Sequence, residues 1–237
     1  MLHRGNSDCV LPDDLESKVW RYVDLARFLD LLRRRQLVLV RLDRFSDYME
    51  GRQTDTWKKA VWSVVVGDRE NERRFQQLDE WRKALYAQCW HLSEFDSSAM
   101  WKLYGAGTNT VAIQSTIGRI VDVIGAQAYF GRVNYIDYSM DDIAGDALAR
   151  ALHKRHHFVH EQECRIVLRR EPIVVSGKHP IDCLDDNPRH VDIDFDLSRL
   201  LAAIYLPPDS PKFLEDAIKD VLKIYLVGSV EVHKSRI

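Results

Sequence analysis

Two glutamates separated by one residue are the feature of this sequence best suited to chemistry. Glu161 and Glu163 stand in the stretch 161–169, whose alternation predicts a β-strand, so both side chains are expected on one face of a sheet. In a cleft, repulsion between the two would raise the pKa of one carboxyl group while the other stays anionic. Such a pair suits reactions at a sugar carbon with an oxocarbenium-like centre. The alternative is a solvent-facing edge strand whose acids pair with Arg165 or Arg169.

A second candidate region combines a serine with aromatic residues. Trp101 and Tyr104 are three residues apart and share one face of an expected helix, and Ser93 lies at the mouth of the turn before it. Aromatic rings in this place can stack on a planar ligand. The same spacing is also typical of core residues.

Four histidines form a third cluster, which contains two pairs with i, i+4 spacing. They are His153, His156, His157 and His160. On a helix this spacing can hold a transition metal, but there is no H-E-x-x-H sequence here. A basic, partly exposed helix face is therefore expected, and no metal. The sequence also contains no P-loop, dinucleotide fingerprint or nucleophile elbow, which excludes those enzyme classes.

The composition is that of an ordinary globular protein, with 46% hydrophobic and 30% charged residues in a chain of 237. We expect one domain over 19–237, preceded by an extension over 1–18. A net charge of −2 argues against a binder that uses its whole surface for nucleic acid. No stretch reaches the roughly 18 apolar residues of a membrane span, and no secretory signal is visible. A cytoplasmic protein with reduced cysteines and no membrane partner is expected.

The elements expected to position these residues mix strands and helices without a regular βαβ rhythm. Strands are predicted at 19–23, 37–41, 84–92, 110–114, 161–169, 191–195, 203–206 and 229–233, and a long strand or a hairpin is predicted at 126–138. Helices are predicted at 25–35 with Asp24 as N-cap, twice within 56–81, through Tyr104, from Ser115 to about 124, at 141–158 and at 211–224. This pattern favours an α+β fold with a mixed or antiparallel sheet and flanking helices.

Several motifs along the chain together carry a resemblance. In order, they are Trp20-Arg21-Tyr22, Arg41-Leu42-Asp43-Arg44-Phe45-Ser46-Asp47 with Glu50-Gly51, Cys89-Trp90-His91-Leu92-Ser93, Met100-Trp101-Lys102-Leu103-Tyr104-Gly105 and His160-Glu161-Gln162-Glu163-Cys164-Arg165. Over about 20–168 they resemble a bacterial family catalogued as domain of unknown function number twenty-nine seventy-one. The layout looks like a remote version of the ADP-ribosyltransferase fold, which implies a split sheet and an early Arg or His, a middle Ser or Tyr and a late Glu.

The resemblance implies transfer of ADP-ribose from NAD to a macromolecule, either protein or nucleic acid. It also implies a role as a toxin or in antiphage defence, with a possible inhibitory partner. In this assignment Glu163 would bind the nicotinamide ribose and stabilise its growing positive charge, and Glu161 would orient or deprotonate the acceptor. NAD would be a co-substrate, and no metal is expected.

The same resemblance assigns cofactor-binding residues. Arg21 would hold the pyrophosphate, with Tyr22 as the alternative residue at the early position of the fold. Trp101 or Tyr104 would stack on nicotinamide. Ser93 would position the ribose or a neighbouring residue.

Two other functions stay open at this point. A metal-dependent nuclease would use Asp137, Glu163 and Arg165, although a guanidinium cannot readily act as a base in place of lysine. A binding or regulatory module would use the acids and aromatics to recognise a partner. A rise in melting temperature with NAD, or an effect of Mg²⁺ or Mn²⁺, would separate these functions.

Overall fold

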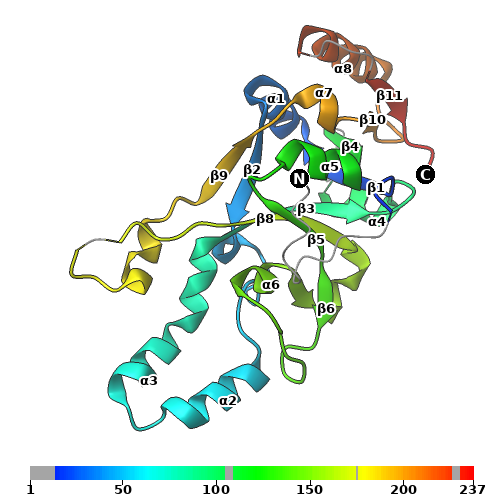
Figure 1. The fold of residues 1–237 in the computed structure, drawn as a ribbon. Coiled ribbons are helices and arrows are strands. Elements are labelled where there is room, and N and C mark those ends of the chain that lie inside the picture. The colour runs from blue at the N-terminus through cyan, green and yellow to red at the C-terminus, as the bar shows by residue number, and fades with distance from the viewer. Residues whose placement is uncertain (1–13, 105–108, 175, 226–229) are drawn as a thin grey trace.

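One sheet with flanking helices forms the body of the protein (Figure 1). The computed structural model describes residues 14–104, 109–174, 176–225 and 230–237. Within them, nine strands form a mostly antiparallel sheet, which confirms the α+β fold expected from the sequence. Residues 1–13 of the expected N-terminal extension lie outside the described residues. No helix in the described part of the chain is long and apolar enough to cross a bilayer.

The strands of the main sheet are β1 (Lys18–Asp24), β2 (Gln36–Arg41), β3 (Leu85–Leu92), β4 (Thr110–Thr116), β5 (Tyr129–Arg132), β8 (Glu163–Arg169), β9 (His190–Asp194), β10 (Ala203–Leu206) and β11 (Glu231–Lys234). A separate parallel pair consists of β6 (Asn134–Ile136) and β7 (His153–Arg155). The helices are α1 (Leu25–Arg34), α2 (Asp55–Val65), α3 (Arg69–Gln76), α4 (Ser98–Tyr104), α5 (Ile117–Ile124), α6 (Ala147–Ala151), α7 (Leu197–Leu200) and α8 (Lys212–Tyr225). Short 3-10 helices are η1 (Leu42–Arg44), η2 (Leu78–Ala84), η3 (His156–Glu161) and η4 (Pro180–Asp186).

β1 shows why the N-terminal part of the chain folds as its sequence predicts. Val19 and Val23 face the main core, whereas Trp20 and Tyr22 pack on the other side of the strand against α4. Asp24 then caps α1, because its carboxylate accepts a hydrogen bond from the main-chain N–H of Arg27 at 2.8 Å. The first strand, its cap and the following helix are therefore confirmed.

The sheet divides at β3. One edge of β3 pairs with β8 from Leu85 to His91. Along the other edge, β2 pairs only with Tyr86 and Ala87, and β1 pairs only with His91 and Leu92. In the described residues, the intervening segment 88–90 has no strand partner on that edge, so β1 and β2 diverge there.

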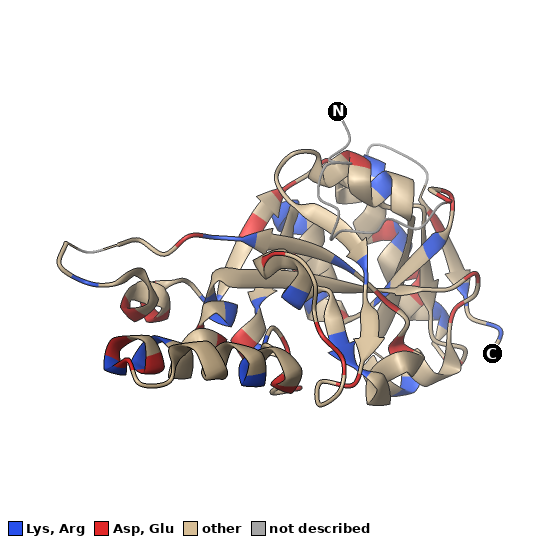
Figure 2. Ribbon diagram, turned by 60° about the horizontal axis from the view of Figure 1, so that its bottom comes forward, with Lys and Arg blue, Asp and Glu red and all other residues tan. Residues whose placement is uncertain are grey.

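α2 and α3 extend away from the sheet as an arm, visible at the bottom of Figure 1. No residue of either helix is buried, and Trp62 of α2 contacts Phe75 of α3 at 5.2 Å between ring centroids. The ribbon in Figure 2 carries both basic and acidic residues along this arm. This mixture agrees with the small net charge of the chain.

Three secondary-structure predictions outside the 161–169 segment are wrong in the described residues. The expected helix 141–158 contains only the short α6, followed by β7 and η3, because β7 pairs with β6 and buries Lys154 against carboxylates. The stretch 126–138, expected as one long strand or a hairpin, contains β5 and β6, which pair with β8 and β7 instead of with each other. Ser115 lies in β4 and donates to the Leu200 carbonyl at 2.6 Å, so Thr116 caps α5 instead.

Candidate functional site

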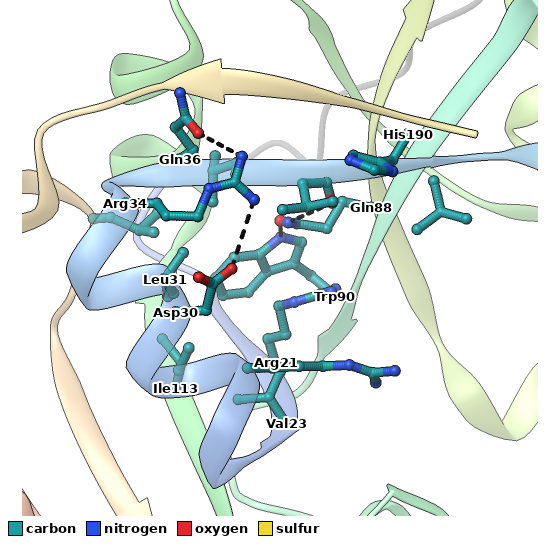
Figure 3. Close-up of a pocket in the computed structure, with 15 residues that line it drawn as sticks. Arg21, Val23, Asp30, Leu31, Arg34, Gln36, Gln88, Trp90, Ile113 and His190 are labelled. Atoms are coloured by element: carbon teal, nitrogen blue, oxygen red, sulfur yellow. Dashed lines mark hydrogen bonds and ion pairs between the residues drawn. The ribbon is translucent and has the colours of Figure 1, made fainter. Parts of the chain in front are cut away.

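A cavity of about 420 Å³ lies at the gap between β1 and β2 along the edge of β3 (Figure 3). β1, β2, β3 and α1 contribute most of its wall. Figure 3 shows Trp90 on this wall, where its indole N–H donates to Gln88 at 3.1 Å, and Arg34 near Asp30 at the rim. The division of the sheet therefore leaves a space that is wide enough for a ligand.

Arg21 reaches from β1 across the gap in the sheet. Its Nη1 donates to the main-chain carbonyl of Cys89 at 2.7 Å, and in the described residues it forms no ion pair. Burial lowers the pKa of Arg21. A guanidinium has five N–H donors, so most of those on Arg21 remain available to an anionic group.

A smaller cavity of about 130 Å³ adjoins the larger one. The two share Arg21, Val23, Arg27 and Trp90 in their walls. The smaller cavity is also lined by residues of α4 and by both glutamates, Glu161 and Glu163. Arg21 therefore lies between a space bounded by α1 and β2 and a space bounded by carboxylates.

Glu161 has a carboxylate held from two sides. Its Oε2 accepts a hydrogen bond from the Tyr104 hydroxyl at 3.0 Å, and its Oε1 lies 3.2 Å from the Nζ of Lys154. The main-chain carbonyl of Glu161 accepts from Nδ1 of His91 at 2.7 Å. Burial raises the pKa of Glu161, and the charge of Lys154 partly offsets that effect. A buried carboxylate with a raised pKa is well suited to exchange a proton.

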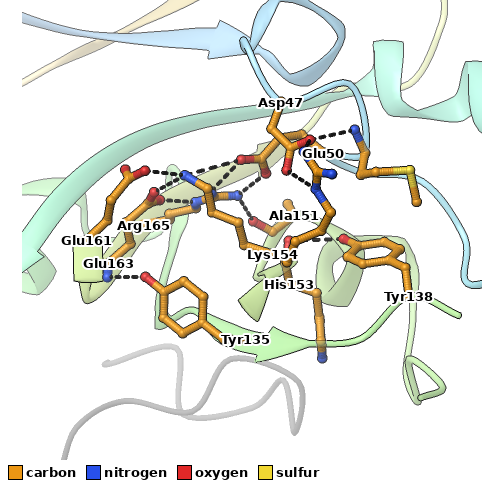
Figure 4. A network of polar contacts seen from close by, with 12 residues as sticks. Asp47, Glu50, Tyr135, Tyr138, Ala151, His153, Lys154, Glu161, Glu163 and Arg165 are labelled. Atoms are coloured by element: carbon orange, nitrogen blue, oxygen red, sulfur yellow. Dashed lines mark hydrogen bonds and ion pairs between the residues drawn. The ribbon is translucent and has the colours of Figure 1, made fainter. Parts of the chain in front are cut away.

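The two glutamates do not lie on one continuous strand, so that prediction is wrong. Glu161 ends η3, and Gln162 has a left-handed backbone with a φ of 39°, which turns the chain before β8 begins at Glu163. The two carboxylates nevertheless meet at one cation, the Nζ of Lys154 (Figure 4). A change of backbone direction, rather than strand alternation, brings them together.

Glu163 has both carboxylate oxygens in ion pairs. Oε1 lies 2.6 Å from Lys154, and Oε2 accepts from Nε of Arg165 at 2.6 Å. Glu50 in turn binds the Arg165 guanidinium at 2.7 and 3.0 Å, as Figure 4 shows. Burial alone would raise the pKa of Glu163, but Arg165 and Lys154 outweigh it and hold the pKa well below its usual range. We call Glu50, Glu163 and Arg165 the ion-pair cluster.

Two tyrosines predicted as cofactor-binding residues line the smaller cavity. Tyr104 is 49% exposed, and burial of its hydroxyl beside Glu161 raises its pKa. Tyr22 is buried, and its hydroxyl accepts from the main-chain N–H of Ser97 at 2.8 Å. Of the two, Tyr104 has the ring that is free to contact a ligand.

The other two predicted cofactor-binding residues lie behind the cavity wall. Trp101 is 8% exposed and packs edge-on against Tyr22, with ring centroids 5.0 Å apart. The Ser93 carbonyl accepts from the indole N–H of Trp20 at 2.7 Å, and its hydroxyl accepts from the main-chain N–H of Phe95. Neither residue belongs to the described lining of the two cavities.

The residues of the nuclease alternative are not brought together. Asp137 accepts from Ser139 and lines a separate cavity of about 240 Å³ with His156 and His157. Within the described residues, no contact joins it to Glu163 or Arg165. In the described residues His153 lies in β7 and the other three histidines lie in the 3-10 helix η3, so the predicted α-helix with two i, i+4 pairs is not formed. The described part of the chain contains no group of three possible ligands that could hold a metal ion.

Lys154 and Glu50 belong to the site's surroundings and were not predicted as site residues. Lys154 lies in the basic stretch that the sequence assigned to a helix, and Glu50 lies more than a hundred residues before its partner Arg165. The only signal for Glu50 was its place beside Gly51 in the ordered motifs. The order of the motifs along the sequence does not show which of their residues are in contact.

Comparison with known proteins yields structural neighbours alone, since no family model and no curated protein matches the chain. DarT of Thermus sp. 2.9 in complex with NAD⁺ is similar with a TM-score of 0.46 and 9% identity, over 96% of this chain and 98% of that one. DarT in complex with ADP-ribosylated ssDNA gives a TM-score of 0.44 and 8% identity, over 93% of this chain and 95% of that one. At this identity and TM-score, the likeness identifies no activity. Membership of the family of unknown function stays a prediction.

Proposed function

We propose that this chain transfers ADP-ribose from NAD to a macromolecular acceptor in the cleft formed by its two adjoining cavities. The observation that carries the proposal is the position of Arg21 between those cavities, with Glu161 in the wall of the smaller one. A guanidinium that forms no ion pair within the described residues, beside a buried carboxylate, suits a ligand that joins a diphosphate to a sugar. The larger cavity falls within the range of about 300–1,000 Å³ that is usual for small-molecule sites.

Arg21 is proposed to hold the pyrophosphate of NAD. Its planar fork can give two parallel hydrogen bonds to phosphate oxygens, and its one bond to the Cys89 carbonyl fixes its direction. Arg27 also borders both cavities and adds positive charge at their junction. The adenosine half would then occupy the larger cavity, and the nicotinamide ribose the smaller one.

Glu161 is proposed to act on the ribose. NAD supplies an activated sugar, whose C1′–N bond breaks so that nicotinamide leaves with the electron pair. The Glu161 carboxylate would stabilise the positive charge that grows on the sugar ring. An acceptor nucleophile then bonds to C1′, and Glu161, whose pKa is raised by burial, is the group placed to take its proton.

This assignment exchanges the roles that the sequence gave to the two glutamates. Both oxygens of Glu163 are in ion pairs and only 3% of its side chain is exposed, so little of the carboxylate is available to the ribose. Glu161 has a hydroxyl donor and a longer contact to Lys154 instead. We therefore assign ribose contact to Glu161 and a supporting role to Glu163.

The predicted cofactor-binding residues receive different parts in the proposal. Tyr104, half exposed and bonded to Glu161, takes the stacking role on nicotinamide. Tyr22 contributes to the cavity wall, and Trp101 holds Tyr22 in place through ring packing. Ser93 fixes the start of the turn before α4 through its bond with Trp20.

The proposed acceptor is a protein or a nucleic acid in the cytoplasm, and the proposed role is that of a toxin or antiphage effector with a possible inhibitory partner. Because one similar structure holds ADP-ribosylated ssDNA, single-stranded DNA belongs among the acceptors to be assayed. Bacterial lysate provides the protein acceptors in the same assay.

Ligand-dependent melting separates the proposal from its alternatives. NAD at saturating concentration is expected to raise the melting temperature, and nicotinamide is expected to appear in solution with time. Mg²⁺ and Mn²⁺ are expected to change neither quantity. A shift with Mg²⁺ or Mn²⁺ and none with NAD would favour the nuclease, whereas no shift with any of the three would favour a binding module.

A further inference from the structure

Lys154 is a buried lysine that contacts three carboxylates at once. Its Nζ lies 2.6 Å from Glu163, 3.2 Å from Glu161 and 3.6 Å from Glu50 (Figure 4). Only 7% of its side chain is exposed. The neighbouring Arg155 serves another pair, since its guanidinium binds Asp47 at 2.7 Å. Lys154 is thus the member of β7 that faces the proposed site.

Every charged or titratable group in contact with Glu161 can be named within the described residues. Tyr104 of α4 donates to one oxygen, and Lys154 of β7 approaches the other. The Glu163 side chain of β8 lies beside the carboxyl group, and His91 of β3 contacts the main-chain carbonyl. The ion-pair cluster lies behind them: Arg165 binds Glu163 and Glu50 and makes no ion pair with Glu161. Lys154 is therefore the cation in direct contact with Glu161.

The charges around Lys154 do not balance. Glu50, Glu161 and Glu163 carry three negative charges, whereas Lys154 and Arg165 carry two positive ones. Arg165 has short contacts to two of the acids, and the shortest contact of Lys154 is to Glu163. Glu161 is left with the longer contact, which stabilises its charge without neutralising it.

We infer that Lys154 is the positioning residue of the site, which orients the Glu161 carboxylate and keeps it ionised next to Glu163; this rests on the proposed function of Glu161. Lys154 does not reach the ligand itself, because its ammonium group is enclosed by the three acids. It acts on the reaction through the charge and direction of Glu161.

The physical reason lies in what Glu161 would meet without this lysine. Burial and the nearby negative charge of Glu163 both favour the protonated form of Glu161. Glu163 would stay anionic without Lys154, because Arg165 still binds it. Loss of Lys154 therefore removes the attraction and keeps the repulsion. An opposite charge within about 4–6 Å typically moves a carboxyl pKa by about 1–3 units.

The test is the pH dependence of NAD turnover by full-length variants. In Lys154→Met, the acid limb of kcat/KM is expected to move to higher pH by about one unit or more, with activity recovering toward wild type at alkaline pH. Lys154→Arg keeps the positive charge, so the acid limb of its kcat/KM profile is expected to stay at the pH of the wild-type limb. Lys83→Met is the matched control, since Lys83 pairs with Asp185 at 2.6 Å outside the site, and its limb is expected to match that of wild type.

Three outcomes would overturn the inference. Lys154→Met could lose the same fraction of activity at every pH, Lys154→Arg could move the limb as far as Lys154→Met, or Lys83→Met could move it equally. If Lys154→Met does not fold, Lys154→Gln replaces it, with the same expected shift. No turnover by the wild-type protein at any pH would contradict the proposed function, whereas an active wild type with an unmoved limb contradicts only the role of Lys154.

Discussion

The ion-pair cluster and the cleft are both built from buried charges, but they differ in how completely those charges are paired. In the cluster, the Arg165 contacts to Glu50 and Glu163 lie between 2.6 and 3.0 Å. In the cleft, Arg21 has one bond to a carbonyl, and Glu161 has a tyrosine and a longer contact to lysine. The same residue types thus stabilise the fold where their charges are fully paired, and we propose that they bind a ligand where the pairing is incomplete.

The cluster also fixes the backbone that carries the cleft. Arg165 of β8 joins Glu50 in the segment after η1 to the end of α6, where it donates to the Ala151 carbonyl at 2.8 Å. The Glu163 main-chain N–H donates to the Tyr135 hydroxyl of β6 at 2.8 Å. A buried ion pair offsets its desolvation only with such geometry and additional hydrogen bonds.

The largest expected effect is on the free energy of unfolding, which Glu163→Gln and Glu161→Gln are expected to lower by different amounts. Glu163→Gln leaves Lys154 and Arg165 incompletely paired in the interior, so the free energy of unfolding is expected to fall by about 3–5 kcal/mol. Urea unfolding measures it. Glu161→Gln is expected to cost much less, because the amide can still accept from Tyr104. Equal losses in the two variants would remove the distinction between cluster and cleft.

Loss of the Arg21 guanidinium is expected to weaken NAD binding by about 10- to 100-fold, the equivalent of about 1.5–3 kcal/mol for hydrogen bonds to a charged group. Titration calorimetry on Arg21→Met measures the dissociation constant. Arg119→Met is the matched control, because Arg119 also donates to main-chain carbonyls but lies outside the cleft. An unchanged affinity in Arg21→Met would exclude Arg21 as the pyrophosphate ligand.

The pH dependence of stability is expected to have opposite signs for the two acids. Glu163 has a depressed folded pKa, so its stabilisation is present above its unfolded pKa of about 4.3 and is lost as the pH falls through the folded value. Glu161 has a raised folded pKa, so its contribution is present below about 4.3 and is lost as the pH rises through the folded value.

Unfolding free energies across pH for wild type and both Gln variants check these signs. The destabilisation by Glu163→Gln is expected to shrink below about pH 4.3, and Glu161→Gln is expected to gain relative to wild type above it, each by up to about 1.4 kcal/mol per pH unit. If the unfolding free energies of the two variants change with pH in the same way, the raised pKa of Glu161 and the lowered pKa of Glu163 would both be contradicted.

The smallest expected effect concerns the hydroxyl that contacts Glu161. Tyr104→Phe removes one donor and keeps the ring, so kcat/KM for NAD is expected to fall about 2- to 10-fold, corresponding to about 0.5–1.5 kcal/mol for one hydrogen bond. Tyr22→Phe serves as the comparison, since its hydroxyl serves the Ser97 main chain and not Glu161. A larger loss of kcat/KM in Tyr22→Phe than in Tyr104→Phe would contradict the role assigned to the Tyr104 hydroxyl.

The sequence predicted those parts of the molecule that depend on local pattern. The alternation of β1, the Asp24 cap and the apolar run of β3 are read within a few residues, and the structure has each of them. Arg21 and Glu161 were assigned to a site from an ordered set of motifs, and the structure places both in the wall of the smaller cavity, but their roles stay predictions. Local rules of this kind hold wherever the core enforces the pattern.

The parts that failed depend on contacts distant in the sequence. The helix expected over 141–158 was replaced because β7 pairs with β6 and Lys154 meets carboxylates from three segments. Trp101 has the spacing of a ligand-stacking residue, but spacing alone cannot distinguish it from the core residue that it is. The left-handed backbone at Gln162 could not be predicted, because the residue there is not the glycine that usually adopts this conformation.

The most direct test is transfer of label from adenine-labelled NAD by purified protein incubated with bacterial lysate or single-stranded DNA, with wild type and Glu161→Gln compared. Removing a preorganised group that acts on the transition state typically costs about 10²–10³-fold. We expect wild type to label a macromolecule and release nicotinamide, and Glu161→Gln to lose both by about that factor while its melting temperature stays near that of wild type. Neither label nor nicotinamide from wild type, or equal turnover by a folded Glu161→Gln, would contradict the proposal.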